Sequence, residues 1–460
     1  MIKPFEEVYK CDSITINITN NCNLRCVYCF EHNKSVHRDN MSVQTAIDIV
    51  DKSYSTHPID QSRFSNKFTI NFFGGEPFLN WEAMKAVIDH CTEKEYDVTY
   101  GVTTNLTILT DEILQYIDDH NIFLLVSIDG IKEIHDRNRC NSFDKVAANI
   151  QLLKDKGLIT YVEGRMTIMP EDVSHLFDSV MTVYNLGINN ICPMVVTDVE
   201  WSQEALDIYR EQYSKLFDFF LDSINDNDNK RNIAMKNIND IIVNVFSPEV
   251  TDGMLCPIFS NRWCAFDTNG DVYPCHQLPT STPEYKKKNY IGNIYTGVDT
   301  DMIRNTQTKV KYYKEECDTC NARLLCKGGC PQENLRMNHR EDEPSKAYCD
   351  TRRLMVEVVK EKQDQIMNAT NIRDRKLNIL KENLKIKKYI DLVYNETDLR
   401  DTLTSSARIM KVKEMINNLG EEKLLPTFKD YFEQRLTLIA SIITTELKFK
   451  KKEIEYNENN

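Results

Sequence analysis

Short hydrophobic runs of two kinds alternate along the first half of the chain. Six runs rich in Ile, Val, Phe and Thr have the length and composition of strands: residues 13–19, 67–73, 97–103, 122–128, 159–169 and 190–196. Between them, apolar residues repeat three or four positions apart, as on one face of a helix, over 41–54, 81–93, 111–119, 143–156 and 172–185. This alternation predicts a parallel sheet, either an open barrel or a doubly wound sheet.

The pattern changes in the second half. Cysteines, glycines and turns dominate from about 250 to 350, and the rest is cysteine-free and helical. Apolar residues share helix faces there: Leu377, Leu380 and Leu384, then Leu436, Ile439, Ile443 and Leu447. Ser405 and Gly420 would cap a helix between them, and residues 448–460 would form a solvated tail. The predicted domains are therefore 1–235, 236–350 and 351–460.

Residues typical of functional sites follow the predicted strands. A cysteine loop begins at Cys22 after the first strand, and Gly-Gly-Glu-Pro occupies 74–77 after the second. Thr104 and Asn105 follow the third strand, the segment 127–130 ends the fourth, and Arg165 lies in the fifth. Active sites of parallel β/α barrels are built at the carboxyl ends of the strands. The sequence thus places one site on this face.

Composition narrows the function classes. The chain has 460 residues, with 57 basic and 70 acidic side chains and a net charge of -13. This balance argues against nucleic acid and an anionic membrane surface as partners, and it suits a basic peptide. No apolar run reaches the roughly 18 residues of a membrane span, and the start has no apolar signal region. We therefore expect a cytoplasmic protein that acts on no membrane.

The chain has 15 cysteines, which is many for a cytosolic protein. Disulfides are disfavoured in that compartment, so metal binding is the leading explanation. Three cysteines lie between Cys22 and Cys29, and eight lie between Cys256 and Cys349. The remaining cysteines are scattered, at Cys11, Cys91, Cys140 and Cys192. Isolated cysteines usually behave as small buried hydrophobes.

The first cysteine group, Cys22, Cys26 and Cys29, supplies one ligand fewer than a tetrahedral zinc ion or a four-iron cluster needs. Three thiolates can bind three corners of a cubane and leave one iron open to a small molecule. The alternative is a stripe on one face of a helix, since these positions are spaced by four and three. Asn23 and Arg25 between them suit a binding loop better.

The Gly-Gly-Glu-Pro segment has a similar double interpretation. Gly74 and Gly75 allow the backbone to approach a ligand closely, and Glu76 offers a carboxylate to an ammonium group. Alone, the segment is a plausible surface turn. Its position after the second strand, facing the cysteine loop in a barrel, favours a binding site.

Together, these motifs resemble the radical S-adenosylmethionine (SAM) superfamily over about residues 13–225. The resemblance implies a partial (β/α)6 barrel with a [4Fe-4S] cluster on Cys22, Cys26 and Cys29, and SAM on the fourth iron. One electron from the cluster would cleave SAM to methionine and a 5′-deoxyadenosyl radical. By the same resemblance, SAM would be contacted by Tyr28, Gly74, Gly75, Glu76, Asn105, Ser127, Asp129 and Arg165.

Three of these assignments have alternatives or departures. The usual Thr-Asn-Gly reads Thr104-Asn105-Leu106 here, which weakens Asn105. Arg165 could equally form an ordinary ion pair in the barrel wall. The run 127–139 resembles the Ser-x-Asp-Gly…His-Asp-x-x-Arg pattern of peptide-modifying members, so His135, Asp136 and Arg139 would shape the substrate side. A capped helix start with local ion pairs is the alternative.

The second cysteine group is too dense to arise from packing alone, and a zinc ribbon is its structural alternative. Its order and spacing resemble the SPASM extension of radical SAM enzymes, which holds up to two auxiliary [4Fe-4S] clusters. The resemblance assigns Cys256, Cys275 and Cys330 to the nearer cluster, and Cys317, Cys320, Cys326 and Cys349 to the outer one. Cys264 lies inside a predicted strand. It either completes the nearer cluster, the alternative we favour, or points into a core and leaves an iron open for a substrate thiolate.

His276 directly follows Cys275, where sulfatase-maturating relatives carry an Asp that acts as general base. A histidine can transfer protons near neutral pH, so His276 is a candidate catalytic residue, although it could also lie on the surface. The departure from Asp argues against sulfatase maturation.

The predicted function is a SPASM-type radical SAM enzyme that oxidatively modifies a ribosomally made peptide, with a thioether between a cysteine sulfur and a carbon as the leading product. Its rivals are a sulfatase-maturating oxidase of a protein side chain and a non-catalytic zinc or electron-transfer protein. An electron donor of the reductase, flavodoxin or ferredoxin type is expected. Only about a dozen residues precede the first strand, so we expect no N-terminal leader-binding domain. The segment 351–460 or a separate protein would recognise the substrate, unless 351–460 serves dimerisation or bracing.

Overall fold

The computed structural model describes residues 1–30, 39–58, 67–224, 233–246, 261–279, 283–308, 315–326, 328–369, 375–396, 402–425 and 428–441. The chain divides into two compact units. The first comprises residues 1–216, 233–236 and 251–352, and the second comprises 217–232, 237–250 and 353–460. The three-domain division remains a prediction.

Six parallel strands, β2 to β7, form the centre of the first unit. Their bounds are Ser13–Thr19, Phe68–Gly74, Val98–Thr104, Phe123–Ser127, Val162–Ile168 and Asn190–Val195. The connecting helices are α2 Val43–Ser55, α3 Trp81–Glu93, α4 Asp111–His120, α5 Lys132–Asn138, α6 Phe143–Asp155 and α7 Leu176–Asn185. The short 3-10 helices are η1 Pro77–Asn80, η2 Leu158–Tyr161 and η3 Pro170–His175. The predicted strands and helices are confirmed, and the sheet is that of a partial (β/α)6 barrel.

Local chemistry explains where these helices begin. Ser42 precedes α2, and its hydroxyl accepts a hydrogen bond from the Thr45 backbone N–H at 3.1 Å. Thr110 caps α4 in the same way, with the Ile113 N–H at 3.2 Å. Each cap satisfies one backbone donor that has no partner within the helix.

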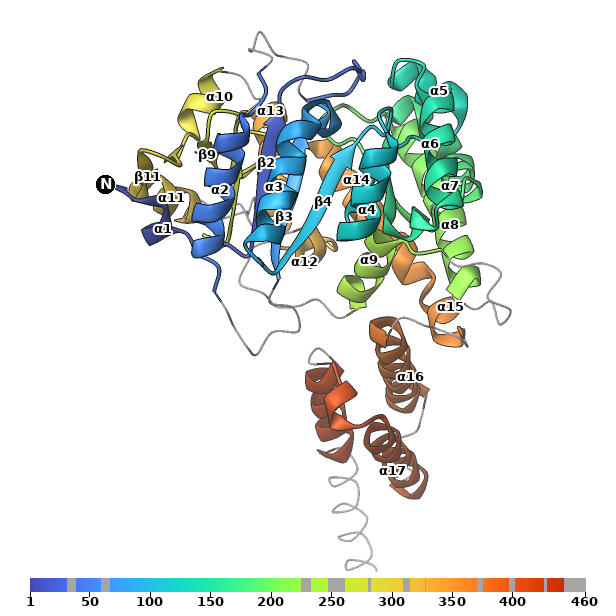
Figure 1. Ribbon diagram of the computed structural model, residues 1–460. Coiled ribbons are helices and arrows are strands. Elements are labelled where there is room, and N and C mark those ends of the chain that lie inside the picture. Colours follow the sequence, from blue (N-terminus) through green and yellow to red (C-terminus); the bar gives the residue numbers. More distant parts are fainter. Residues whose placement is uncertain are drawn as a thin grey trace, which may run out of the picture. The chain divides into compact units, whose positions relative to one another are not determined.

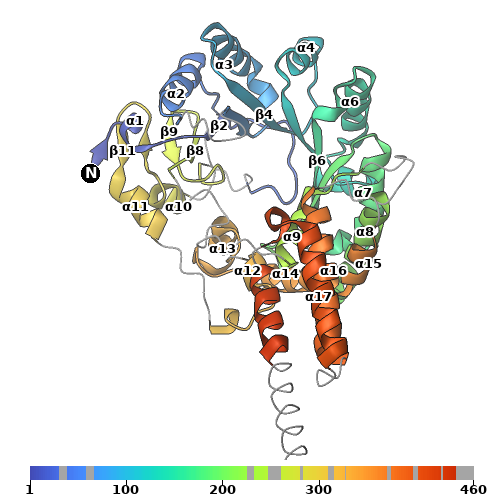
Figure 2. The same ribbon diagram turned by 90° about the horizontal axis from the view of Figure 1, so that it is seen from below.

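Helices cover the outer face of the sheet. Phe68, Ile70 and Phe72 of β3 are fully buried under this layer. Helices α2, α3, α4 and α6 form an arc outside the strands (Figures 1 and 2). The alternate side chains of β3, among them Asn71 and Phe73, are partly buried and line a cavity on the other face.

Five further strands extend the same sheet beyond β2, and among them the sequence predicted only β8, as the strand around Cys264. They are β1 Ile2–Lys3, β8 Trp263–Phe266, β9 Asp271–Tyr273, β10 Gly292–Asn293 and β11 Gly297–Asp299. The sheet order is β1-β11-β10-β9-β8-β2-β3-β4-β5-β6-β7. Strand β8 pairs parallel with β2, with Ser13 opposite Trp263. These strands have two to four residues each, too few for a periodic pattern in the sequence.

The other described helices are mostly in the second half of the chain. They are α1 Phe5–Val8, α8 Gln203–Ile224, α9 Lys236–Phe246, α10 Pro283–Lys288, α11 Thr300–Thr308, η5 Glu315–Cys317, α12 Arg323–Cys326, α13 Pro331–Asn338, α14 Lys346–Glu361, α15 Gln363–Asn368, α16 Arg375–Glu396, α17 Thr402–Leu419 and η6 Glu421–Lys423. Residues 428–441 are also helical. Within the described ranges, no helix is long and apolar enough to cross a bilayer.

The helical prediction for the end of the chain is largely confirmed. Leu380 and Leu384 are fully buried on α16, and Ile439 packs with Val393. Gly420 follows α17 with a φ of 87°, as a helix-ending glycine does. The predicted cap at Ser405 is wrong, because α17 already begins at Thr402. Ile443, Leu447 and the predicted tail at 448–460 lie outside the described residues.

Candidate active site

A cavity of about 740 Å³ opens at the carboxyl ends of the parallel strands. Its lining brings together the three cysteines of the first group and most predicted cofactor-binding residues: Cys22, Cys26, Cys29, Tyr28, Gly74, Gly75, Asn105, Ser127 and Arg165. His276 and Trp263 also line it. The strand ends therefore meet at one site, as the sequence predicted.

The cysteine loop follows β2 and is an irregular turn. The Cys29 N–H donates to the Cys26 carbonyl at 3.1 Å, and the Leu24 N–H donates to the Cys22 sulfur at 3.4 Å. All three thiols are partly exposed towards one cavity. The helix-stripe alternative is wrong, because the described residues after β2 form no helix in this loop.

The Gly-Gly pair holds the cysteine loop against the end of β3. The Gly75 N–H donates to the Thr19 carbonyl at 2.9 Å, and the Glu76 N–H donates to the Asn21 carbonyl at 2.8 Å. A Cβ on Gly75 would stand 2.1 Å from the Asn21 carbonyl oxygen. Only glycine allows this close approach, which fixes the loop next to the cavity.

Glu76 is fully buried behind the cavity lining. Its carboxylate accepts hydrogen bonds from the Thr104 hydroxyl and the Asn105 N–H, each at 2.7 Å, and from the Phe78 N–H at 3.3 Å. Burial raises the pKa of this carboxyl to about 7, although the three donors oppose the rise. Asn105, directly after β4, also donates to the Asn23 side chain at 2.9 Å and so connects the end of β4 to the cysteine loop.

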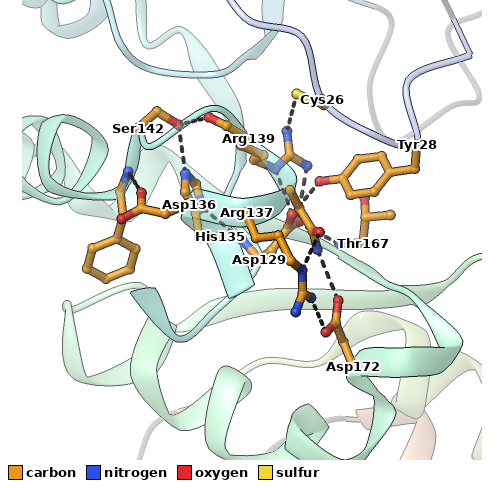
Figure 3. Close-up of polar contacts among 12 residues, drawn as sticks. Cys26, Tyr28, Asp129, His135, Asp136, Arg137, Arg139, Ser142, Thr167 and Asp172 are labelled. Carbon is orange, nitrogen blue, oxygen red and sulfur yellow. Dashed lines mark hydrogen bonds and ion pairs between the residues drawn. The ribbon is translucent and has the colours of Figure 1, made fainter. Parts of the chain in front are cut away.

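Asp129, at the end of β5, is also fully buried. Its carboxylate accepts from the Arg139 guanidinium at 2.9 and 3.2 Å, from the Thr167 N–H at 3.0 Å and from the Tyr28 hydroxyl (Figure 3). Both oxygens are therefore engaged by the protein itself. The structure thus places Asp129 behind the cavity lining, and its expected contact with the cofactor stays a prediction.

His135 and Asp136 support the helices around Asp129. His135 is fully buried, accepts from the Asp129 N–H at 3.3 Å and pairs with the Ser142 hydroxyl at 2.9 Å. Burial lowers the pKa of His135 to about 4, so the ring is neutral at neutral pH. Asp136 accepts from the Phe143 N–H at 2.9 Å at the start of α6. The structure favours the local-support interpretation of these two residues (Figure 3).

Arg165 and Ser127 are opposite one another on neighbouring strands β6 and β5, and both line the cavity. The Arg165 guanidinium donates to the Cys192 sulfur at 3.0 Å. Among the residues that the structure describes, Arg165 forms no ion pair with a carboxylate, so the alternative of a barrel-wall ion pair has no support there. Its charge faces the cavity instead.

His276 lines the cavity beside residues of β3 and β8. Its ring packs against Phe73, with centroids 4.6 Å apart, and against Trp263 at 6.2 Å. Burial, followed by the charge of Arg165, lowers the pKa of His276 to about 4. His276 is thus a neutral, cavity-lining ring and not a surface residue.

The second cysteine group is described in part. Cys256 lies outside the described residues. Cys275 is buried, and its sulfur accepts from the Gln277 N–H at 3.5 Å. Cys264 is fully buried next to Cys11, and burial raises the pKa of its thiol well above the ordinary value. Its neighbour Trp263 lines the cavity, so Cys264 points to the other face of β8, which favours the alternative of a core cysteine.

The other five cysteines of the second group lie on turns and helix ends of the first unit. They are Cys317, Cys320, Cys326, Cys330 and Cys349. The Cys320 N–H donates to the Cys317 carbonyl at 3.3 Å, and the Gly329 N–H donates to the Cys326 carbonyl at 3.1 Å. Within the described ranges, no three His, Cys, Asp or Glu side chains surround a point where a single metal ion would sit. A four-iron cluster makes a different demand, since its thiolates are spread over several irons.

One wall of the cavity contains polar residues that the sequence analysis missed. The Thr197 hydroxyl donates to Glu333 at 2.6 Å, and burial raises the pKa of that carboxyl. Arg336 pairs with Asp198 at 2.7 Å and donates to Gln277 at 2.9 Å. The signal available was weak: Glu333 and Arg336 lie one turn apart on α13, directly after Cys330.

A parallel β/α barrel with a three-cysteine loop at its strand ends defines a class of enzyme, and comparison with known families agrees. Residues 16–181 match the family model of the radical SAM superfamily. Residues 16–181 are therefore a radical SAM domain, and the resemblance read from the motifs is confirmed. This family implies a [4Fe-4S] cluster and SAM, and the three cavity cysteines fit such a cluster.

Curated relatives share parts or most of the chain. An uncharacterised protein of Methanocaldococcus jannaschii, MJ0907, is 31% identical over 125 residues, which span 27% of this chain and 40% of that protein. A cysteine-type anaerobic sulfatase-maturating enzyme of Clostridium novyi is 23% identical over 72% of this chain and 91% of its own length. The subtilosin biosynthesis protein AlbA of Bacillus subtilis is 25% identical over 38% of this chain and 37% of its own length.

Solved structures share the fold. The sulfatase-maturating enzyme anSMEcpe, with bound AdoMet and the Cp18Cys peptide, superposes with a TM-score of 0.61 at 20% identity, covering 78% of this chain and 99% of its own. Streptococcus suis SuiB, bound to the precursor peptide SuiA, gives 0.53 at 13% identity, covering 75% and 77%. The predicted fold class, a partial barrel followed by a further region and C-terminal helices, is confirmed.

Proposed function

We propose that this radical SAM enzyme is a maturase that oxidatively modifies a ribosomally made peptide, with a thioether cross-link as the leading product. One observation carries the proposal: Cys22, Cys26 and Cys29 share a cavity with His276 and with the wall formed by Asp198, Gln277, Glu333 and Arg336. The cavity is therefore large enough and polar enough to hold a substrate beside the cofactor site.

When bound, the cluster supplies one electron for cleavage of SAM to methionine and a 5′-deoxyadenosyl radical. The chain's own residues bind and orient. We assign the ammonium group of SAM to Glu76, and its remaining polar groups to Asn105, Ser127 and Arg165. Tyr28 and the Gly74–Gly75 backbone would border the adenosine. Asp129 would act behind the lining by fixing Tyr28.

Thioether formation removes two hydrogens from the peptide. With SAM bound, one hydrogen atom would be lost from a substrate carbon and one proton from the substrate thiol, and formation of the carbon–sulfur bond would leave one electron to be removed. A neutral His276 is able to accept the proton. An auxiliary cluster on the second cysteine group would accept the electron.

We propose two auxiliary clusters. The nearer one would use Cys256, Cys275 and Cys330, and the outer one Cys317, Cys320, Cys326 and Cys349. Because Cys264 is packed against Cys11, we now favour three protein thiolates on the nearer cluster. Its open iron would then be available to a substrate thiolate.

The substrate would bind against the polar wall of the cavity. Glu333, Asp198 and Arg336 give this wall one net negative charge, and Gln277 adds a neutral amide. Such a wall suits backbone N–H groups or a basic side chain of a peptide. Recognition of a leader by 351–460 or by a separate protein, a flavodoxin- or ferredoxin-type donor, and a cytoplasmic location stay predictions.

The sulfatase-maturating alternative has specific support in the match over 72% of this chain. It would place a cysteine or serine of a folded or nascent sulfatase in the same cavity. His276 in place of the usual Asp remains the residue that argues against it. The rival of a non-catalytic zinc protein falls with the family match.

The decisive experiment is anaerobic turnover of the reconstituted enzyme with SAM, dithionite and two substrates. One is the product of a small cysteine-rich reading frame, which the proposal expects beside the gene, and the other is a sulfatase-derived Cys peptide. We expect 5′-deoxyadenosine with both hydrogens lost from the first peptide, detected by mass spectrometry. Formylglycine on the second peptide and no change in the first would establish the alternative.

His276→Gln separates proton transfer from SAM cleavage in the same assay. We expect product formation to fall by about 10²-fold, in line with the loss of a general base. SAM cleavage and iron content should be retained. Gln203→Ala, on the exposed part of α8, is the matched control. Unchanged product formation in His276→Gln would remove His276 from the proposal.

A further inference from the structure

The segment after α5 is packed directly against the cysteine loop. The Val27 N–H donates to the Asn138 carbonyl at 3.0 Å, and the Arg25 N–H donates to the Cys140 sulfur at 3.1 Å. Cys140 and its successor Asn141 have φ angles of 58° and 54°, in the left-handed region. This reversal turns the chain sharply after α5, so that residues 138–140 face the loop.

Arg139 occupies the centre of this contact. Its guanidinium is 6% exposed and makes two hydrogen bonds to the fully buried Asp129. The ring of Tyr28 lies 5.2 Å from the guanidinium carbon, and the Tyr28 hydroxyl donates to the same carboxylate (Figure 3). Arg139 is thereby fixed in one orientation by a partner of opposite charge.

The Nη1 atom of the guanidinium points towards a proposed cluster ligand. Arg139 Nη1 lies 3.9 Å from the Cys26 sulfur, and Figure 3 shows this contact beside the Asp129 pair. Water screens charges little at such burial, so both members of the pair act on Cys26 at short range. Removing either member would leave one uncompensated charge beside the ligand.

We infer that Arg139 is a positioning residue whose charge, balanced by Asp129, sets the reduction potential of the cluster on Cys22, Cys26 and Cys29. Reduction adds one negative charge to the cluster. The cation of Arg139 stabilises that reduced form and raises the potential, and the anion of Asp129 lowers it. The inference rests on the cluster of the proposed function, and not on its peptide chemistry.

The test uses full-length protein, reconstituted with iron and sulfide, and no peptide. The midpoint potential of the SAM-sensitive cluster is measured by dithionite titration followed by electron paramagnetic resonance, and the change of its signal on adding SAM distinguishes it from other clusters. We expect Arg139→Gln to lower the potential and Asp129→Asn to raise it. The double variant should return towards the wild-type value.

Arg137, on α5, provides a matched control. Arg137 is two residues earlier, pairs with Asp172 and is half-exposed, so Arg137→Gln should leave the potential unchanged. If Arg139→Gln fails to retain iron, Arg139→Lys should retain it. Because lysine keeps the positive charge, the reduction potential of the cluster should not fall as it would on loss of that charge.

The outcomes are distinguishable. Shifts of the two single variants in the same direction, or Asp129→Asn at or below the wild-type potential, would overturn the inference, because a purely structural role predicts no opposite signs. A wild-type protein that forms no SAM-sensitive cluster would instead contradict the proposed function itself.

Discussion

The two cysteine regions of the molecule are supported by different kinds of structure. The loop at 22–29 follows a seven-residue strand and is bonded to β3, to the segment after β4 and to the segment after α5. The region 317–349 consists mainly of turns and short helices: η5 has three residues, α12 four and α13 eight. Only its last cysteine, Cys349, lies on a long helix, the 16-residue α14. Gly328 and Gly329, between α12 and α13, have φ angles of 87° and 78°.

This difference bears on what each region needs in order to fold. Helices of three to eight residues are not stable alone, and a bound metal can supply the missing folding energy. The loop at 22–29 has its position dictated by neighbouring strands. We therefore expect the first region to present its thiols before iron arrives, and the second to be completed by iron.

The largest expected effect separates the regions by function. Cys26→Ser should abolish SAM cleavage, because it removes a ligand of the proposed catalytic cluster. The measurement is 5′-deoxyadenosine by liquid chromatography under dithionite. Cys91→Ala, a buried cysteine of α3, is the control and should retain cleavage. Substantial cleavage by Cys26→Ser would contradict the assignment of the first region.

The next effect is expected in the second region. Cys320→Ser should retain SAM cleavage and lose peptide product by more than the roughly 10–100-fold that loss of an outer-shell partner costs a metal site. Both products are quantified in the same turnover assay. Equal loss of SAM cleavage and of peptide product would contradict the separate roles proposed for the two cysteine regions.

A third prediction concerns pH and the scaffold of the first region. The carboxyl of Glu76 has a usual pKa of 4.5, raised by burial to about 7 in the folded protein. Protonation therefore favours folding: this contribution is fully present below 4.5 and is lost as the pH rises through 7. Between pH 5.5 and pH 8, Glu76 should cost the iron-free protein about 2 kcal/mol.

Glu76→Gln removes this titration, since the amide is neutral at both pH values. The measurement is urea unfolding of the iron-free wild type and variant at pH 5.5 and pH 8. The difference in free energy of unfolding should move in favour of the variant as the pH rises. A difference that is the same at both pH values would show that the carboxyl does not titrate in this range.

The smallest expected effect concerns how much iron stabilises each of the two cysteine regions. Chelation of iron should make cleavage by trypsin between 315 and 349 at least about tenfold faster, which corresponds to ~1.4 kcal/mol of local stability. Cleavage within 13–30 and 67–224 should change little. Mass mapping of the fragments gives the sites. Equal acceleration in both regions would mean that iron supports the whole unit.

Much of the barrel was predictable because its signals are local. Strands β2 to β7 and their helices repeat a pattern long enough to read, and β2 was placed at its observed bounds, Ser13–Thr19. A strand was expected around Cys264 and is β8, but β9 to β11 were not predicted, since two or three residues carry no period. Their existence depends on tertiary contacts.

The site was predictable at the level of motifs and not of contacts. The cysteine loop and Gly-Gly-Glu-Pro gave its location. That Asp129 is saturated by Arg139, Tyr28 and Thr167, and so lies behind the cavity, follows from the packing of four separate segments. Cys264 is similar: its sequence neighbours suggested a ligand, and only the face of β8 that it occupies points to the core.

The parallel pairing of β8 with β2 has a consequence for synthesis of the chain. The partners Ser13 and Trp263 are 250 positions apart. At 5–20 residues per second, a ribosome needs roughly 12–50 s to deliver the second partner after the first. During this interval the β2 edge stays unpaired, and such an edge attracts other strands. Chains cut before residue 263 should therefore aggregate.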